Sequence, residues 1–258
     1  MPGAVKVFGS PTSSEVARVL ACLFEKDVEF QLIRVDSFRG PNRMPQYLKL
    51  QPHGEALTFE DGNVTLVESR KILRHIADKY KAQGNPDLIG MGALERSSIE
   101  QWLQTEAQSF DMPSAEMIYS LAYLPLTMPL DGKNAGAGAG AGGGRRDARQ
   151  QQQQDMMLNP QKLEEMKQLF EKSKKDLNKV LDIYDQRLEE AEYLAGDKFT
   201  LADLSHMPNT DRLASDPRSL RLIQSRRNVS RWWADVSGRE SWVYVKSLQR
   251  PPSSDAAF

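Results

Sequence analysis

A cluster of hydroxyl side chains near the N-terminus is the part of the chain best suited to chemistry. It follows a strand-like segment, Val5–Gly9, and precedes an amphipathic helical pattern near Glu15–Lys26. The first turn of a helix presents N–H groups without intrahelical partners and the positive pole of the helix dipole, so it favours an anion. We therefore expect this turn to bind a group that carries or develops negative charge. The turn reads Ser10-Pro11-Thr12-Ser13-Ser14.

The elements around this turn predict a small mixed sheet. Apolar residues alternate over Val28–Val35, which indicates a second strand after the first helix. Ala56–Phe59 and Val64–Val67 flank an Asp-Gly turn and predict a hairpin. A helix follows over Glu68–Tyr80. The order βαβ then ββα predicts a thioredoxin-like arrangement.

The rest of the chain predicts an all-α domain. Helical patterns occur over Leu94–Tyr123 and Pro160–Ala191, with no convincing strand from residue 93 to the tail. We expect a thioredoxin-like domain over 1–82, a linker over 83–92 and a helical bundle over 93–258. Residues 134–154 alternate Ala and Gly and then run into glutamines, a composition that predicts a disordered insertion.

Composition and charge narrow the function classes. The chain has 258 residues, and 34 basic residues balance 35 acidic ones to a formal charge of -1. This balance gives no general attraction to nucleic acid or to an anionic membrane. Arg145, Arg146 and Arg149 lack the interleaved aromatic residues typical of nucleic-acid binding. No apolar run reaches the length that crosses a bilayer, and the start lacks a signal-peptide pattern.

The single cysteine and the histidines do not indicate a metal or redox site. Cys22 is the only cysteine, so the chain cannot form an intrachain disulfide or a cysteine zinc site. Its apolar neighbours predict a buried thiol, and we expect a reducing compartment. His53, His75 and His206 show no metal-ligand spacing, so we expect structural or exposed roles and no metal.

A second helix start is encoded near residue 200. Thr200 is followed three residues later by Asp203, the spacing of a capping box, and Phe199 and Leu204 fit a hydrophobic staple. We expect a structural role for Asp203. Further on, Trp232 and Trp233 follow a candidate helix cap at Asn228 and predict a late helix packed on the bundle.

Three segments together resemble the plant phi-class glutathione S-transferases. The resemblance covers nearly the whole chain apart from the low-complexity insertion, and the third segment is its most specific part. The fold it implies is the predicted one, with glutathione bound by the first domain and a hydrophobic electrophile held mainly by the second. It also implies a cytosolic homodimer. The segments are Lys6–Ser13, Glu68-Ser69-Arg70 and Ala195-Gly-Asp-Lys-Phe-Thr-Leu-Ala-Asp-Leu-Ser-His206.

The resemblance assigns the catalytic role to Ser13. Its hydroxyl would donate a hydrogen bond to the sulfur of glutathione and favour the thiolate, with glutathione as cosubstrate and no cofactor. The reacting nucleophile belongs to the bound tripeptide, so Ser13 needs no neighbouring base. The residues alone leave open that Ser13 is an ordinary helix cap, and Ser14 is the alternative donor.

The resemblance also implies residues that hold glutathione. Glu68 suits the γ-glutamyl ammonium and Ser69 the γ-glutamyl carboxylate, and the alternative explanation of this pair is a capped helix with an acidic first turn. Asn42 and Arg43 lie where the family holds the glycyl carboxylate. The backbone of Ala56 lies where the family pairs with the cysteinyl unit.

Two positions depart from the family pattern. The family has a proline, in the cis form, where this chain has Leu57, and a cis bond before a residue other than proline costs about 2.5–4 kcal/mol. We therefore expect the Ala56–Leu57 bond to be trans or strained. Glu55 replaces a glutamine and puts a carboxylate beside an anionic ligand. Both changes predict weak glutathione binding.

The candidates for an apolar wall of the electrophile pocket are also typical core residues. They are Pro11, Phe38, Met112, Tyr119 and Tyr123. The leading interpretation is a glutathione S-transferase. One alternative is a weakly catalytic or non-catalytic carrier of hydrophobic molecules, similar to a ligandin, and a third is an adaptor that uses the low-complexity insertion.

Overall fold

The computed structural model describes residues 5–35, 57–124 and 160–250. Its N-terminal part is built on a mixed sheet of four strands in the order β2-β1-β3-β4. The strand β1 pairs in parallel with β2 and antiparallel with β3, which in turn pairs antiparallel with β4. This is the predicted thioredoxin-like pattern. The strands are β1 (Val5–Gly9), β2 (Phe30–Ile33), β3 (Leu57–Asp61) and β4 (Val64–Leu66).

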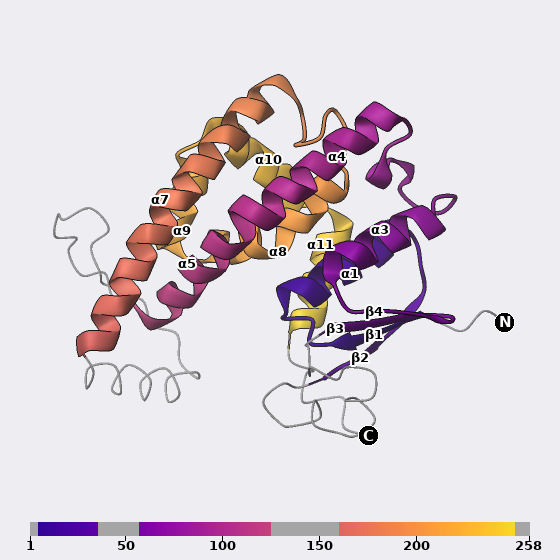
Figure 1. Ribbon diagram of the computed structural model, residues 1–258, viewed down its shortest axis with the longest axis horizontal. Helices are drawn as coiled ribbons and strands as arrows, with labels where there is room; N and C mark the ends of the chain where they lie inside the picture. Colours follow the sequence, from indigo (N-terminus) through magenta and orange to yellow (C-terminus); the bar gives the residue numbers. More distant parts are fainter. Residues whose placement is uncertain (1–4, 36–56, 125–159, 251–258) are drawn as a thin grey trace.

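Two helices, α1 (Ser14–Glu25) and α3 (Ser69–Lys79), cover one face of this sheet (Figure 1). The parallel β1 and β2 are joined by α1, as expected for a βαβ unit. Between β3 and β4, Gly62 adopts a φ of 63°, a left-handed conformation that glycine reaches without a steric penalty. The predicted hairpin is therefore confirmed.

The chain then enters the helical half through a short 3-10 helix, η2, over Pro86–Ile89. The sequence predicts only a linker over 83–92, but Leu88 is fully buried and the side chain of Asn85 caps the turn. One helical rod follows, in which the π-helix η3 (Glu106–Phe110) joins α4 (Ala93–Thr105) to α5 (Asp111–Tyr123).

The long α7 (Pro160–Glu190) packs against α5, and the remaining helices close the bundle around α8. Figure 1 shows α8 inside the bundle, and its first ten residues are all buried. An apolar or neutral surface on every side of a helix is typical of a core helix. No helix in the described ranges is long and apolar enough to span a membrane. These last helices are α8 (Leu201–Ser215), α9 (Pro217–Gln224), α10 (Arg227–Ser237) and α11 (Glu240–Gln249).

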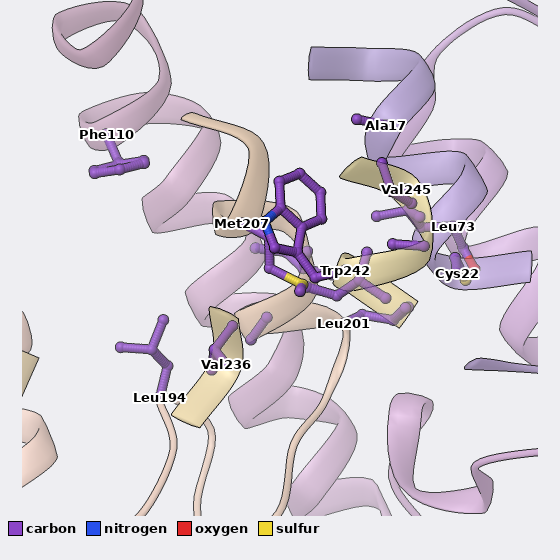
Figure 2. Close-up of a cluster of buried hydrophobic side chains, with 14 of the residues drawn as sticks. Ala17, Cys22, Leu73, Phe110, Leu194, Leu201, Met207, Val236, Trp242 and Val245 are labelled. Carbon is purple, nitrogen blue, oxygen red and sulfur yellow. Dashed lines mark hydrogen bonds between the residues drawn. The ribbon is translucent and has the colours of Figure 1, made fainter. Parts of the chain in front are cut away.

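The core is continuous between the sheet part and the bundle. Figure 2 shows Trp242 of α11 among side chains from α1, α3 and α8. Cys22 is fully buried in this cluster, which confirms the predicted core thiol, and burial raises the pKa of that thiol. The two halves therefore share buried apolar surface.

The late helix is present, but the predicted cap is wrong. Helix α10 begins after Arg226, which makes no side-chain cap. A carboxylate of α7 does the capping instead: Asp185 Oδ1 accepts from the N–H of Asn228 at 2.8 Å and of Val229 at 3.1 Å. Trp232 and Trp233 are buried as predicted. The predicted insertion at 134–154 lies outside the described residues.

Candidate active site

Ser13 is the N-cap residue of α1 and lies in the turn that leaves β1. Its backbone N–H donates to Ser10 O at 2.9 Å, and its carbonyl accepts from Ala17 N–H at 2.9 Å. A serine in this position ordinarily caps the helix with its hydroxyl. The Ser13 hydroxyl makes no such bond, and its side chain is only half-buried. The interpretation of Ser13 as an ordinary side-chain cap is not supported.

The neighbouring hydroxyls are already engaged. Ser10 Oγ and Thr12 Oγ1 are 2.8 Å apart, and Ser14 Oγ donates to Asn209 Oδ1 of α8 at 2.7 Å. Within the described residues, Ser13 carries the one hydroxyl of this turn without a hydrogen-bond partner. Of these two serines, Ser13 is therefore the one whose hydroxyl is available to a ligand.

Helix α3 packs against α1. Ser69, the first residue of α3, is fully buried, and its hydroxyl has no hydrogen-bond partner among the described residues. An unpaired hydroxyl in an apolar environment costs about 1–3 kcal/mol, so such a group suits a ligand that supplies the bond. Leu57 begins β3 beside Gly9, the residue that precedes the hydroxyl-rich turn.

Glu68 caps α3 with its carboxylate. Its two oxygens accept from Arg70 N–H at 3.0 Å and Lys71 N–H at 2.8 Å. Glu68 therefore forms the capped helix start that was the alternative explanation for this residue. The same side chain is 42% exposed and its Oε1 lies 3.8 Å from Arg70 Nη1, so a further cation can approach the carboxylate only from its solvent side.

A buried ionic cluster joins the two helix starts, and the sequence did not reveal it. Glu106 of η3 is fully buried and accepts from Arg18 Nη2 at 2.9 Å and from Arg70 Nε at 2.7 Å. Asp111 bridges the same two guanidinium groups at 2.9 Å and 3.0 Å. Burial acts to raise the pKa of Asp111, but Arg18 and Arg70 hold it below its usual value.

The cluster continues to the hydroxyl-rich turn through Asn209. Its amide donates to Asp111 Oδ1 at 2.9 Å and to Ser114 Oγ at 3.0 Å, while its carbonyl oxygen accepts from Ser14. Charged groups buried in this way need complete pairing, because an unpaired one is strongly destabilising. The sequence signal was an arginine within the otherwise apolar run around Val16–Leu23.

The candidate wall residues lie in two environments. Pro11 is buried, whereas Met112 and Tyr119 of α5 are 65% and 47% exposed and so are not core residues. The Tyr119 and Tyr123 rings are 4.9 Å apart between centroids. The candidates Phe38, Asn42, Arg43, Glu55 and Ala56 lie outside the described residues, and so does the Ala56–Leu57 bond.

Comparison with known proteins identifies the family. Residues 3–78 match the model of the glutathione S-transferase N-terminal domain, and residues 146–240 match that of the C-terminal domain. Glutathione S-transferase F11 of Arabidopsis thaliana is 37% identical over 244 residues, covering 95% of the chain and 98% of that relative. The chain belongs to the phi-class glutathione S-transferases. The resemblance inferred from the three segments is therefore confirmed.

Other plant glutathione transferases are similar to this chain over nearly its whole length. Glutathione S-transferase PARB of Nicotiana tabacum is 35% identical over 96% of the chain and 98% of its own length. The crystal structure of glutathione transferase F2 from Populus trichocarpa is 40% identical, with a TM-score of 0.77 over 95% of this chain and 98% of that one. The glutathione S-transferase fold thus extends over both halves.

Proposed function

We propose that this chain conjugates glutathione to hydrophobic electrophiles and that Ser13 stabilises the glutathione thiolate. The observation that carries the proposal is the uncommitted Ser13 hydroxyl at the N-terminus of α1 in a phi-class chain. The sulfur of the thiolate attacks an electrophilic carbon and forms a C–S bond. The leaving group departs with the electrons of its own bond, and the thiol proton goes to solvent.

The energy needed for this role is modest. A thiol titrates near pH 8.5, and lowering its pKa by two units corresponds to about 2.7 kcal/mol of preference for the thiolate. A hydrogen bond to an anion contributes about 1.5–3 kcal/mol. The positive end of a helix contributes about 0.3–1 kcal/mol more. One hydroxyl at one helix start is therefore sufficient.

The other residues that bind glutathione in this proposal are at the start of α3 and in the segment before β3. In this proposal the buried Ser69 hydroxyl and its helix N-terminus bind the γ-glutamyl carboxylate, and the exposed face of Glu68 binds the γ-glutamyl ammonium. Arg43 and Asn42 hold the glycyl carboxylate, and the Ala56 backbone pairs with the cysteinyl unit. Met112, Tyr119 and Tyr123, with Pro11 and Phe38, border the electrophile.

The decisive experiment compares Ser13→Ala with Ser14→Ala. Conjugation of a chlorodinitrobenzene-type electrophile is measured at saturating glutathione. We expect Ser13→Ala to lower kcat/KM by about 100-fold, equivalent to about 2.7 kcal/mol. Ser14→Ala should cost much less, because its hydroxyl is directed at Asn209. Equal losses in both variants, or binding of a hydrophobic probe without any turnover by the wild type, would overturn the proposal.

We infer that glutathione affinity is reduced by Glu55 and Leu57. The support is chemical: Glu55 adds a carboxylate near an anionic ligand, and Leu57 lacks the preference of proline for the bend that presents the preceding backbone. The double variant Glu55→Gln with Leu57→Pro should bind glutathione more tightly by calorimetry, and Glu55→Gln alone should recover part of the gain. An unchanged Kd contradicts the inference.

We also infer that the protein acts as a homodimer in the cytosol, as the family membership suggests. Light scattering on the purified chain gives the assembly state. Fluorescent tagging in plant cells gives the compartment. A monomer at micromolar concentration, or signal confined to an organelle, would contradict this inference.

A further inference from the structure

The backbone just before Ser13 is held by two side chains of the helical half. The carbonyl of Pro11 accepts from Gln249 Nε2 of α11 at 2.9 Å. The carbonyl of Thr12 accepts from Arg212 Nη2 of α8. These donors lie more than 190 residues from the turn in sequence, so tertiary contacts position the turn in addition to its own hydrogen bond from Ser13 N–H to Ser10 O.

The residue after Ser13 is held by α8 as well. Ser14 Oγ donates to Asn209 Oδ1, and Asn209 is itself fixed by Asp111 and Ser114. The turn is thus attached to the helical half on both sides of Ser13. The hydroxyl of Ser13 is left between these attachments.

Arg212 differs from the other arginines around the turn because its charge is not compensated by an ion pair. Within the described residues its guanidinium has one hydrogen-bond partner, the Thr12 carbonyl, and no carboxylate within salt-bridge distance. The adjacent Asp211 is taken by Trp242 Nε1 at 3.1 Å and Lys246 Nζ at 2.9 Å. By contrast, Arg18 is neutralised by its two carboxylate partners.

We propose that Arg212 is a positioning residue for the glutathione reaction: it fixes the Thr12–Ser13 backbone and adds, beside the developing thiolate, a positive charge that has no ion-pair partner among the described residues. The proposal rests on the function assigned above. A cation near an anion lowers the pKa of the group that forms it. A guanidinium keeps its charge over the whole working range, so this contribution does not titrate.

The other charged groups near the turn have to stay unchanged in any test. They come from each element packed around it. On α1, Glu15 is an exposed carboxylate, and Arg18 is paired with Glu106. On α5, Asp111 is paired, and on α8 and α11 Asp211 and Lys246 pair with each other. Removal of Arg212 changes the net charge at the turn by one unit.

The test is the pH dependence of kcat/KM in Arg212→Met and Arg212→Lys. In parallel, the thiolate absorption of bound glutathione is titrated directly. In Arg212→Met the midpoint of both pH titrations should rise by about half a pH unit to one pH unit. At a pH below that midpoint, kcat/KM should therefore fall several-fold. Arg212→Lys keeps the charge and should leave the midpoint within a few tenths of a unit.

Two further variants separate charge from position. Gln249→Ala removes the bond to the Pro11 carbonyl without changing charge, so it should lower kcat and leave the midpoint in place. Arg227→Met is the matched control, since Arg227 is an exposed arginine at the start of α10 away from the turn. It should leave both kcat and the midpoint unchanged. Circular dichroism establishes that each variant is folded.

The outcomes distinguish this inference from the proposed function. If the wild type conjugates and Ser13→Ala does not, but Arg212→Met keeps the wild-type midpoint, only the role of Arg212 is overturned. If the midpoint rises equally in Arg212→Met and Arg212→Lys, the charge is not its source and the inference also fails. If the wild type shows neither turnover nor a thiolate signal, both fall together.

Discussion

Two helix starts in this molecule have the same chemistry and use it differently. At α8, the Thr200 hydroxyl accepts from Ala202 N–H at 3.3 Å, and Asp203 accepts from Thr200 N–H at 3.0 Å. At α1, the Ser13 hydroxyl makes no cap bond. Thr200 is buried and Ser13 is half-buried. A hydroxyl used for capping stabilises the fold, whereas one left unpaired at an accessible helix start remains available to a ligand.

The α8 start also extends its bonds into the core. Besides the cap, Asp203 accepts from Leu194 N–H at 3.0 Å and from Trp232 Nε1 at 2.9 Å. One turn later His206 contacts Tyr184 at 2.7 Å and the Ala202 carbonyl at 2.6 Å. Burial outweighs these hydrogen bonds and raises the pKa of Asp203. The predicted structural role of Asp203 follows from these contacts.

The largest effect we expect in this comparison is on stability at Asp203. Asp203→Ala leaves two backbone N–H groups, one indole N–H and the Thr200 hydroxyl without their buried acceptor, so the free energy of unfolding should fall by about 3–5 kcal/mol. Urea unfolding followed by tryptophan fluorescence measures it. Asp197→Ala, an exposed aspartate just before this helix, is the control and should change stability by less than about 0.5 kcal/mol. A loss below 1 kcal/mol at Asp203 would refute a structural role.

The second effect is a pH dependence of the free energy of unfolding, which arises from His206 on α8. Burial lowers the pKa of His206 to about 4, so the folded state keeps this ring neutral, with Nδ1–H donating to Ala202 and Nε2 accepting from Tyr184. The unfolded ring takes up its proton near pH 6.5, so stability should fall as the pH drops from about 6.5 to about 4, by up to about 3 kcal/mol.

Urea midpoints measured through this pH window test the effect. Carboxylates in the unfolded chain gain protons mainly near pH 4, at the lower end of the window. His206→Gln should make the urea midpoint nearly independent of pH above about pH 4. A wild-type midpoint constant between about pH 6.5 and 4.5 would contradict the buried neutral histidine.

Thr200→Ala should give a smaller loss, about 1 kcal/mol, because it removes the side-chain cap but leaves the Asp203 bond to the residue 200 backbone. Thermal unfolding detects a change of this size. Conjugation of the electrophile should keep the wild-type rate, since the described contacts of the Thr200 hydroxyl lie within the capping box itself. If Thr200→Ala lost activity but kept its stability, the start of α8 would have the functional role that we assign to the start of α1.

The smallest effect is expected for the stability of Ser13→Ala. With no cap bond to lose, this substitution should change the free energy of unfolding by less than about 0.5 kcal/mol while it removes most of the activity. The same thermal measurement compares it directly with Thr200→Ala. A loss of 1 kcal/mol or more would mean that the Ser13 hydroxyl caps α1 in solution.

Local patterns predicted the elements whose causes lie within a few neighbouring residues. The capping box spans Thr200–Asp203, and residues 62–63 connect the two strands of the hairpin, so both features can be predicted from sequence. Asn228 failed as a cap because the acceptor, Asp185, comes from another helix.

The candidate site also has a part that local patterns predict and a part that depends on distant contacts. The hydroxyl-rich turn pointed to Ser13, and the family resemblance supplied Ser69. Glu106 meets Arg18 across 88 positions, and Arg212 meets Thr12 across 200. Contacts at such separations leave no periodic signal in the sequence, so an arginine within an apolar run indicated a buried charge, but neither its partners nor the side chains that hold the turn were predictable.

The side chains on α1 have a consequence for modularity. Arg18 is bound by the Ser205 carbonyl at 2.7 Å and by Glu106, and Glu25 accepts from Arg239 Nε at 2.8 Å and Ser241 Oγ at 2.6 Å. All four partners belong to the helical half. A fragment that ends at the connector would expose the apolar face of α1 and lose these partners. The sheet is therefore not a transferable module: gene fusions or chimeras that exchange it must exchange the matching faces of η3, α8 and α11 with it.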